Sequence, residues 1–180
     1  AMKGLLITDQ KEPLLLSDIE MPTAKAGQVL VRLKAVALNR RDQWIRQGMY
    51  PKIQFNTVLG SDGAGIVESV GTGVNADLIG KEVIINPNVN WGDNPDAQSA
   101  DYSVLGMPTH GTFAEYIAVD VDRLAAKPAH LSWTDAAALP LGGLTAYRAI
   151  FHQGQLKSGQ NVLISGVGGG VAQFAFLFAS

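Results

Sequence analysis

Residues 161–172 combine a short apolar run with a cluster of glycines, a combination suited to binding a dinucleotide. Residues 161–165 predict a buried parallel strand, 166–170 read Gly-Val-Gly-Gly-Gly, and 171–179 predict an apolar helix. Glycines at such a turn let the backbone approach a pyrophosphate, which rests on free N–H groups of the helix N-terminus. No register gives G-x-G-x-x-G, and the nearest one places Val167 at the first position. A tight turn without a ligand is the alternative interpretation.

A dinucleotide held by this turn would lie against five consecutive residues: Val167, Gly168, Gly169, Gly170 and Val171. The side chain that separates NAD from NADP lies about 20 residues beyond such a turn. That position is beyond residue 180, so the sequence predicts NADP or NAD without choosing between them.

Side chains that could bind a transition metal are few and scattered. The chain has no cysteine, which excludes disulfides, thiolate zinc sites and a cysteine nucleophile. The three histidines are far apart, and the aspartates between residues 93 and 101 lack the spacing of a calcium loop. We therefore predict no metal site.

The first 125 residues have the pattern of a β-rich region. Residues 29–37 alternate, with Val29 and Val31 on one face and Arg32 and Lys34 on the other, which is the period of a half-buried strand. Gly, Pro, Asn and Asp clusters separate the other candidates. Further strands are predicted over residues 2–7, 14–19, 64–70, 82–85 and 113–119.

Residues 39–47 predict a short helix that Gly48 closes. Asn39 and Asp42 stand at its start, where either side chain could simply cap it. Trp44 follows on the same helix and could belong to the core.

From residue 132 the pattern becomes helical. Residues 132–135 resemble a capping box ahead of an Ala-rich helix that Pro140 stops, and residues 141–152 predict a second helix. The strand at 161–165 would be alone, although a parallel strand needs neighbours reached through crossover helices. We therefore expect the chain to be truncated within its second domain.

The apolar run at residues 174–178 would have nothing to cover it. Phe174, Phe176, Leu177 and Phe178 would face a sheet that this chain does not contain. We expect the run to be disordered or buried against another copy of the chain, so a homodimer is one expectation.

Composition excludes several classes of partner. A net charge of −2 gives no electrostatic footprint for nucleic acid. No apolar stretch reaches the roughly 18 residues that span a membrane, and we expect no signal peptide, because no basic start followed by an apolar stretch is present. With 47% hydrophobic and 17% charged residues, the chain reads as a packed globular protein, and cytoplasm is the expected compartment.

Four motifs in order resemble the medium-chain dehydrogenase/reductase superfamily, and specifically its zinc-free quinone-oxidoreductase-like branch. Residues 39–48 match N-x-x-D-x-x-x-R-x-G, and residues 60–71 match G-x-E-x-x-G-x-V-x-x-V-G with Asp62 in place of Glu. Residues 111–116 match G-x-[FY]-A-E-Y, and 139–147 match L-P-x-x-G-L-T-A-[YW]. The resemblance implies a mostly β GroES-like domain over residues 1–125. It also implies the first strand and helix of an α/β Rossmann domain over 126–180.

The same resemblance implies site residues. Asn39 would hold the nicotinamide carboxamide, and Thr145 would touch the cofactor near its ribose or phosphate. Trp44 and Tyr50 would line the substrate pocket, and Asp42 could orient Asn39 or a neighbouring Arg. Zinc-using members carry a Cys and a His as catalytic ligands. Here Asn39 stands near the first position and Ser61 at the second, so the resemblance implies no zinc.

Three functions are consistent with these patterns. The leading one is zinc-independent NAD(P)H-dependent hydride transfer to a quinone, enone, aldehyde or ketone, a small-molecule carbonyl or quinone substrate. A zinc alcohol dehydrogenase is disfavoured by the missing ligands. A non-catalytic descendant serving as a binding or structural module is the third, and Val167 in the glycine turn favours it. We expect these 180 residues to fold but to be inactive alone.

Overall fold

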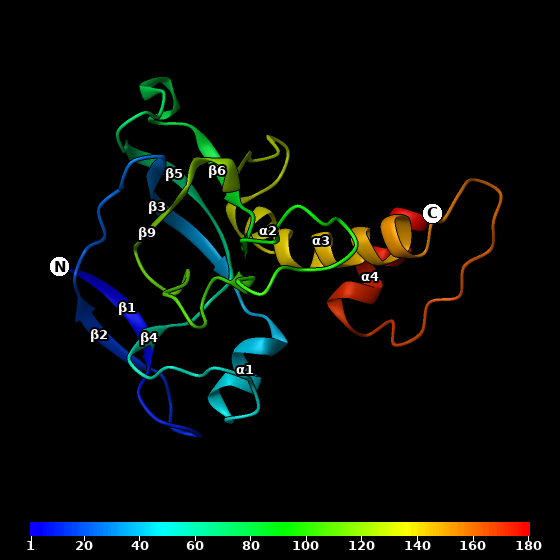
Figure 1. Ribbon diagram of the computed structural model, residues 1–180, viewed down its shortest axis with the longest axis horizontal. Helices are drawn as coiled ribbons and strands as arrows, with labels where there is room; N and C mark the ends of the chain where they lie inside the picture. Colours follow the sequence, from blue (N-terminus) through cyan, green and yellow to red (C-terminus); the bar gives the residue numbers. More distant parts are fainter.

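The computed structural model describes all 180 residues, and its larger part is a β-rich region (Figure 1). Its five-stranded antiparallel sheet has the order β10-β6-β5-β3-β9, a three-stranded sheet has the order β2-β1-β4, and β7 pairs with β8. The strands are β1 (Met2–Ile7), β2 (Leu15–Ile19), β3 (Gln28–Ala37), β4 (Thr57–Val58), β5 (Asp62–Val70), β6 (Glu82–Ile85), β7 (Asn88–Val89), β8 (Ser103–Val104), β9 (Tyr116–Asp120) and β10 (Leu124–Ala126).

The alternation in β3 gives the main sheet one buried face. Val29 and Val31 are fully buried, while Lys34 is exposed and Arg32 forms a salt bridge with Glu68 of β5. Because side chains alternate across a strand, one apolar set covers the core and the other stays in water. The core on that face contains Val29, Val31, Val67, Val83, Ile85, Leu105, Ile117 and Val119.

A second core packs the short helix α1 (Arg40–Arg46) against the three-stranded sheet β2-β1-β4. Ile45 of α1 is fully buried and packs with Leu59, Met107 and Phe113. The backbone at Gly60 has φ +96°, and a Cβ there would lie 2.4 Å from the Phe113 ring. Only glycine fits this position, which turns the chain from β4 into β5.

Helix α2 (Trp133–Ala137) begins at Ser132, whose hydroxyl accepts a hydrogen bond from the Asp135 amide, as the capping pattern predicts. Its Ala136 and Ala137 pack on Ala64 of β5. Helix α3 (Pro140–Tyr147) follows directly and continues into a π-helical stretch, η3 (Arg148–Gln153). The remaining helices are η1 (Ala76–Leu78), η2 (Val121–Arg123) and α4 (Gly170–Ala179). None of the helices is long and apolar enough to cross a membrane.

Residues 91–96 form a loop, and side chains of η3 hold it. We name this set of contacts the clasp. The Arg148 guanidinium lies 4.3 Å from the Trp91 ring centroid and donates hydrogen bonds to the carbonyls of Pro95 and Asp96. His152 Nε2 lies 2.9 Å from Asp96 Oδ1. The clasp therefore ties the β-rich region to the far end of the α3–η3 helix.

The structure confirms the strands predicted in the β-rich region, with shifts of one to three residues at some ends. The last of these predictions began at residue 113, but β9 starts at Tyr116 because residues 112–114 turn to pair with the start of β1. The short strands β4, β7, β8 and β10 were not predicted. Their two or three residues are too few to show a period of two.

The predicted strand at residues 161–165 is wrong: this segment has no regular secondary structure. Leu163 is 96% exposed, and none of the backbone hydrogen bonds outside helices and strands joins the segment to another strand. An apolar run forms a strand only when a neighbour supplies hydrogen-bond partners, and no strand of this chain lies beside it.

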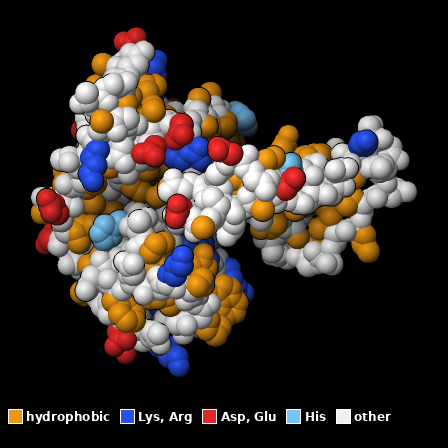
Figure 2. Space-filling model, viewed as in Figure 1, with side chains coloured by type: hydrophobic (Ala, Val, Ile, Leu, Met, Phe, Trp, Pro, Cys, Tyr) orange, Lys and Arg blue, Asp and Glu red, His pale blue; other side chains and the backbone are white.

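Helix α4 folds back against α3 rather than being disordered, which corrects that part of the prediction (Figure 1). The buried member is Ala175, packed with Ala146 and Ile150, and the Phe174 ring lies over Gly142. Phe176 and Leu177 remain 61% and 65% exposed. The predicted buried face is therefore mostly on the surface, and hydrophobic side chains gather over this lobe in Figure 2.

Candidate functional site

Asp62, the first residue of β5, lies where the β-rich region meets α3. Its side chain is 1% exposed, and its two carboxylate oxygens accept hydrogen bonds from different elements. Asn39 Nδ2 donates to Oδ2 at 3.0 Å, and the Leu141 amide of α3 donates to Oδ1 at 2.9 Å. Burial raises the pKa of Asp62 from 3.8 to about 6, although both of these hydrogen bonds act in the opposite direction.

Asn39 is the N-cap residue of α1, as its position in the sequence suggested. Its backbone amide donates to Asp42 Oδ2 at 2.8 Å, and its backbone carbonyl accepts from the Asp42 amide. The Asn39 side chain completes a capping box with Asp42, in which its oxygen faces the Asp42 amide without the geometry of a full hydrogen bond, while its amide nitrogen donates to Asp62. Asn39 Oδ1 therefore has the Asp42 amide nearby, keeps a free lone pair, and belongs to a half-buried side chain.

Asp42 is a buried residue of α1, and its carboxylate accepts a hydrogen bond from the Asn39 backbone amide. Burial raises its pKa, against the opposing effects of the Asn39 amide and the Arg41 charge. The Gly60 amide also lowers this pKa but makes no hydrogen bond of normal geometry, so Asp42 Oδ1 has no partner.

Arg41 is the residue that joins most parts of this cluster, and the sequence analysis did not select it. One terminal nitrogen donates to Ser61 Oγ at 2.6 Å and to the Leu105 carbonyl at 2.8 Å. The other donates to Tyr50 Oη at 3.2 Å and to the Met107 carbonyl at 3.4 Å. A usable signal was present: Arg41 precedes buried Ile45 by four residues and so shares its helix face.

Tyr50 is half-buried, and the Arg41 guanidinium lies 4.9 Å from its ring centroid. Because Arg41 donates to the phenol oxygen, the Tyr50 hydroxyl proton is free to point elsewhere. Trp44 lies on another face of α1, is 39% exposed, and has the Arg40 guanidinium 5.7 Å from its ring centroid. The structure thus brings Tyr50, but not Trp44, into hydrogen-bonding contact with the cluster.

Thr145 lies one turn along α3 from the Asp62 contact. Its hydroxyl donates to the Leu141 carbonyl at 2.7 Å, and the side chain is exposed. Asn39 and Thr145, which come from different regions of the chain, are therefore joined by hydrogen bonds through Asp62 and Leu141. No sequence motif indicated the Leu141 amide, since any residue supplies one.

The glycine turn lies apart from this cluster. Residues 166–169 form an exposed turn ahead of α4, below α3 in the view of Figure 1. A Cβ at Gly168 or Gly170 would meet no atom within 4 Å, so the backbone there is open to a ligand. The first amides of α4 have no helical partners, which suits a phosphate. The structure does not bring Val167–Val171 into contact with Asn39.

The positions of the zinc ligands in zinc-using members do not fit a metal ion in this chain. Ser61 Oγ accepts from Arg41 and donates to the Leu105 carbonyl at 2.8 Å, so its hydrogen-bonding capacity is used. The Arg41 guanidinium beside it would repel a cation. No group of three or more His, Cys, Asp or Glu side chains is placed to hold a metal ion.

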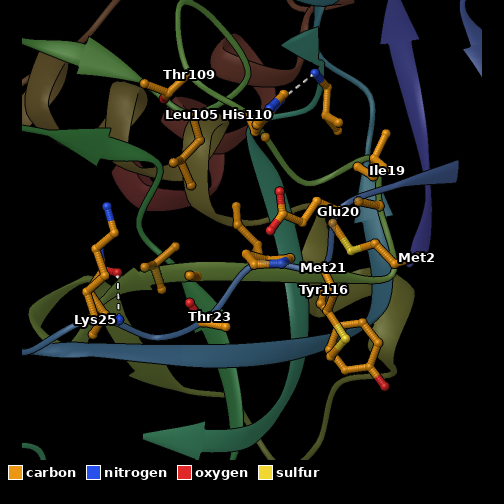
Figure 3. A pocket seen from close by; sticks show the side chains of 18 of the residues that line it. Met2, Ile19, Glu20, Met21, Thr23, Lys25, Leu105, Thr109, His110 and Tyr116 are labelled. Atoms are coloured by element: carbon orange, nitrogen blue, oxygen red, sulfur yellow. Dashed lines mark hydrogen bonds between the residues drawn. The ribbon is translucent and has the colours of Figure 1, made fainter. Parts of the chain in front are cut away.

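A cavity of about 780 Å³ lies elsewhere in the β-rich region (Figure 3). Met2, Ile19 and Tyr116 line one side of it, and the His110 ring accepts a hydrogen bond from the Val58 amide. This cavity shares only Leu105 with the Arg41 contacts. The cavity is therefore separate from the cluster around Asp62, whose distinguishing feature is its buried polar contacts.

Comparison with known proteins shows the family of this chain. Residues 25–129 match the alcohol dehydrogenase GroES-like domain. The chain is 38% identical over 92% of its length to "Zinc-type alcohol dehydrogenase-like protein YogA" of Leptosphaeria maculans, of which it covers 49%. It is 33% identical over 87% of its length to "Quinone oxidoreductase" of Rattus norvegicus, of which it covers 42%.

Solved structures give the same result for the fold. A crystal structure of an NAD-dependent alcohol dehydrogenase matches 99% of this chain with a TM-score of 0.92 and 37% identity. The match covers 55% of that chain. The chain thus spans about half the length of the relatives it matches.

Proposed function

Because this chain belongs to the alcohol dehydrogenase GroES-like family, within the medium-chain dehydrogenase/reductase superfamily, we propose that the whole protein is a zinc-independent NAD(P)H-dependent oxidoreductase. Its acceptor is a quinone, an enone, or an aldehyde or ketone. The nicotinamide supplies the hydride when it is bound, and the protein supplies binding, orientation and polarisation of the acceptor.

One observation carries the proposal: Asn39 Oδ1 and Thr145 Oγ1 both keep acceptor capacity and stand on the two elements that Asp62 joins. Asn39 holds the nicotinamide carboxamide. Thr145, one helical turn after Leu141 on α3, contacts the cofactor near its ribose or phosphate. The Val167–Val171 segment binds the phosphates through the free amides at the start of α4.

The acceptor is polarised without a metal. Tyr50 has a hydroxyl proton that Arg41 does not use, and a hydrogen bond from such a donor stabilises negative charge developing on a carbonyl oxygen. Trp44, on another face of α1, supplies an exposed ring to the substrate pocket of the whole protein. Asp42 acts through Asn39, whose backbone it holds.

Turnover and cofactor binding in the whole protein test this proposal. NADH and NADPH should be oxidised with at least one acceptor in a panel of quinones, enones and small aldehydes. Asn39→Ala should raise the Kd for the cofactor about tenfold, the equivalent of one lost hydrogen bond. No turnover together with no cofactor binding would overturn it.

The absence of zinc is tested separately. Elemental analysis of the purified protein should find substoichiometric zinc, because Ser61 is engaged by Arg41. About one chelator-resistant zinc per chain would contradict this part and leave the hydride-transfer proposal standing.

A non-catalytic binding module is the second candidate, and Val167 at the first position of the glycine turn favours it. Such a module would keep the fold and the Asp62 contacts while failing to oxidise either cofactor. The same acceptor panel therefore separates the two candidates.

A further inference from the structure

We infer that Asp62 is a positioning residue of the cofactor site, whose carboxylate aligns Asn39 with helix α3 and fixes which hydrogen-bonding atoms both present to the nicotinamide cofactor. This inference rests on the proposed function. It assigns a role to a buried carboxylate that touches neither substrate nor cofactor.

The two carboxylate oxygens of Asp62 accept hydrogen bonds from different parts of the chain. Oδ2 accepts from Asn39 Nδ2 at 3.0 Å, and Oδ1 accepts from the Leu141 amide at 2.9 Å. The Asp62 backbone is also held in place, because Thr112 Oγ1 donates to the Asp62 backbone carbonyl at 2.8 Å and Thr112 is fully buried. A residue that only capped α3 would need a single acceptor, and here the second one is used on Asn39.

The Asp62 carboxylate determines which end of the Asn39 side-chain amide faces it. An ionised carboxylate only accepts hydrogen bonds, so the Asn39 amide must turn its NH₂ group toward Asp62. Its Oδ1 then faces the Asp42 amide of the capping box, keeps a second lone pair, and is the atom available to a ligand. An acceptor at this point matches the NH₂ group of a nicotinamide carboxamide, rather than its carbonyl.

The hydrogen bonds that begin at Asp62 continue through Leu141 to Thr145. The Leu141 amide donates to Asp62, and the Leu141 carbonyl accepts the Thr145 hydroxyl proton at 2.7 Å. Thr145 Oγ1 therefore also presents acceptor lone pairs. A cofactor group that pairs with it must donate, which fits a ribose hydroxyl and excludes an ionised phosphate.

An Asp62→Asn substitution in the whole protein reverses this polarity with little change in shape. The substituted side chain must use its single oxygen for the Leu141 amide, so its NH₂ faces Asn39. The Asn39 amide then rotates and presents its own NH₂ to the cofactor. A matched Asp→Asn change at exposed Asp120, far from the cluster, serves as the control.

The measurement compares the oxidised nicotinamide cofactor with its 3-acetylpyridine analogue, in which a methyl ketone replaces the carboxamide and no donor remains. Calorimetry with the wild type should give a Kd about tenfold weaker for the analogue, the equivalent of one hydrogen bond. In Asp62→Asn the two Kd values should become nearly equal, because an NH₂ donor at residue 39 pairs with either carbonyl. Asp120→Asn should keep the wild-type ratio.

Each outcome decides a different statement. Equal Kd values in the wild type would overturn the inference, since Asn39 would not be presenting Oδ1. Equal weakening of both ligands in Asp62→Asn, at an unchanged ratio, would also overturn it and leave Asp62 with a structural role alone. A wild type that binds neither ligand would instead overturn the proposed function.

A second pair of variants is independent of whether Asp62→Asn folds. Thr145 is exposed, so Thr145→Val and Thr145→Ser should both fold. Thr145→Val should weaken cofactor binding roughly fivefold to tenfold, and Thr145→Ser should restore it. Unchanged binding in Thr145→Val would contradict the acceptor role.

Discussion

The α3–η3 helix is attached to the β-rich region at both ends, and the two attachments differ in kind. At its start, the Leu141 amide meets the fully buried Asp62 carboxylate. At its end, the clasp holds the 91–96 loop through Arg148 and His152, in contact with solvent. One attachment uses a single carboxylate in a dry environment, and the other uses several contacts in a wet one.

The difference shows how environment decides what a hydrogen bond contributes. Removing a partner in the interior leaves an unsatisfied polar group, which costs more than the net value of the bond. Removing a partner at the surface lets water replace it. We therefore expect the buried attachment to govern stability and alignment, and the clasp to govern the local order of its loop.

The largest effect is expected from Asp62→Ala. The change leaves the Leu141 amide and Asn39 Nδ2 without their acceptor, and we expect the free energy of unfolding to fall by about 3 kcal/mol. Urea denaturation measures it, with Asp62→Asn as the variant that retains one acceptor. A loss no greater than that of the Arg148 variant below would remove the contrast between the two attachments.

A pH dependence follows from the raised pKa of Asp62. The folded state holds this proton up to about pH 6, whereas the unfolded chain releases it near 3.8. The folded state therefore binds more protons between pH 4 and 6, so the contribution of Asp62 to stability falls as the pH rises through this window. We expect an effect on the order of 2 kcal/mol, measured as the difference between wild type and Asp62→Asn at pH 4.5 and pH 7. Parallel stability curves for the two proteins would contradict it.

An intermediate effect is expected from Arg148→Met in the clasp. The variant loses the contact with Trp91 and two hydrogen bonds to backbone carbonyls, for a cost of about 1 kcal/mol. Hydrogen exchange should become faster in the 91–96 loop and stay unchanged at β5. Faster exchange at β5 would mean that the two attachments act together.

The smallest effect is expected from His152→Gln. The side chains of His152 and Asp96 are 37% and 78% exposed, so the pair is screened and its loss should change stability by less than about 0.5 kcal/mol. Thermal denaturation at pH 7 measures this. A change as large as that of Arg148→Met would show that the clasp depends on the imidazole.

Local patterns predicted much of the fold. The alternation of residues 29–37, the capping sequence at Ser132 and the glycine after α1 each act within a few residues, so the sequence was sufficient to place them. The 161–165 prediction failed because a strand depends on a partner, and periodicity cannot tell whether the chain contains one.

The site was predictable only in part, for the same physical reason. Asn39 and Asp42 belong to a local motif, and the structure joins them by a hydrogen bond. The Arg41 contacts depend on carbonyls more than sixty residues away, and the Asp62 contact depends on a backbone amide of α3. Contacts of that range come from the tertiary fold, which no short motif specifies.

The Arg41–Ser61 hydrogen bond limits how a metal site could be built at positions 39 and 61. Introducing a Cys at position 39 and a His at position 61 would not by itself create a metal enzyme, because the guanidinium would still lie against the new ligand. A change at Arg41 would have to come with them, and it would release Tyr50 and the 105–107 backbone at the same time. Building a metal site here would therefore require coordinated substitutions at positions 39, 41 and 61.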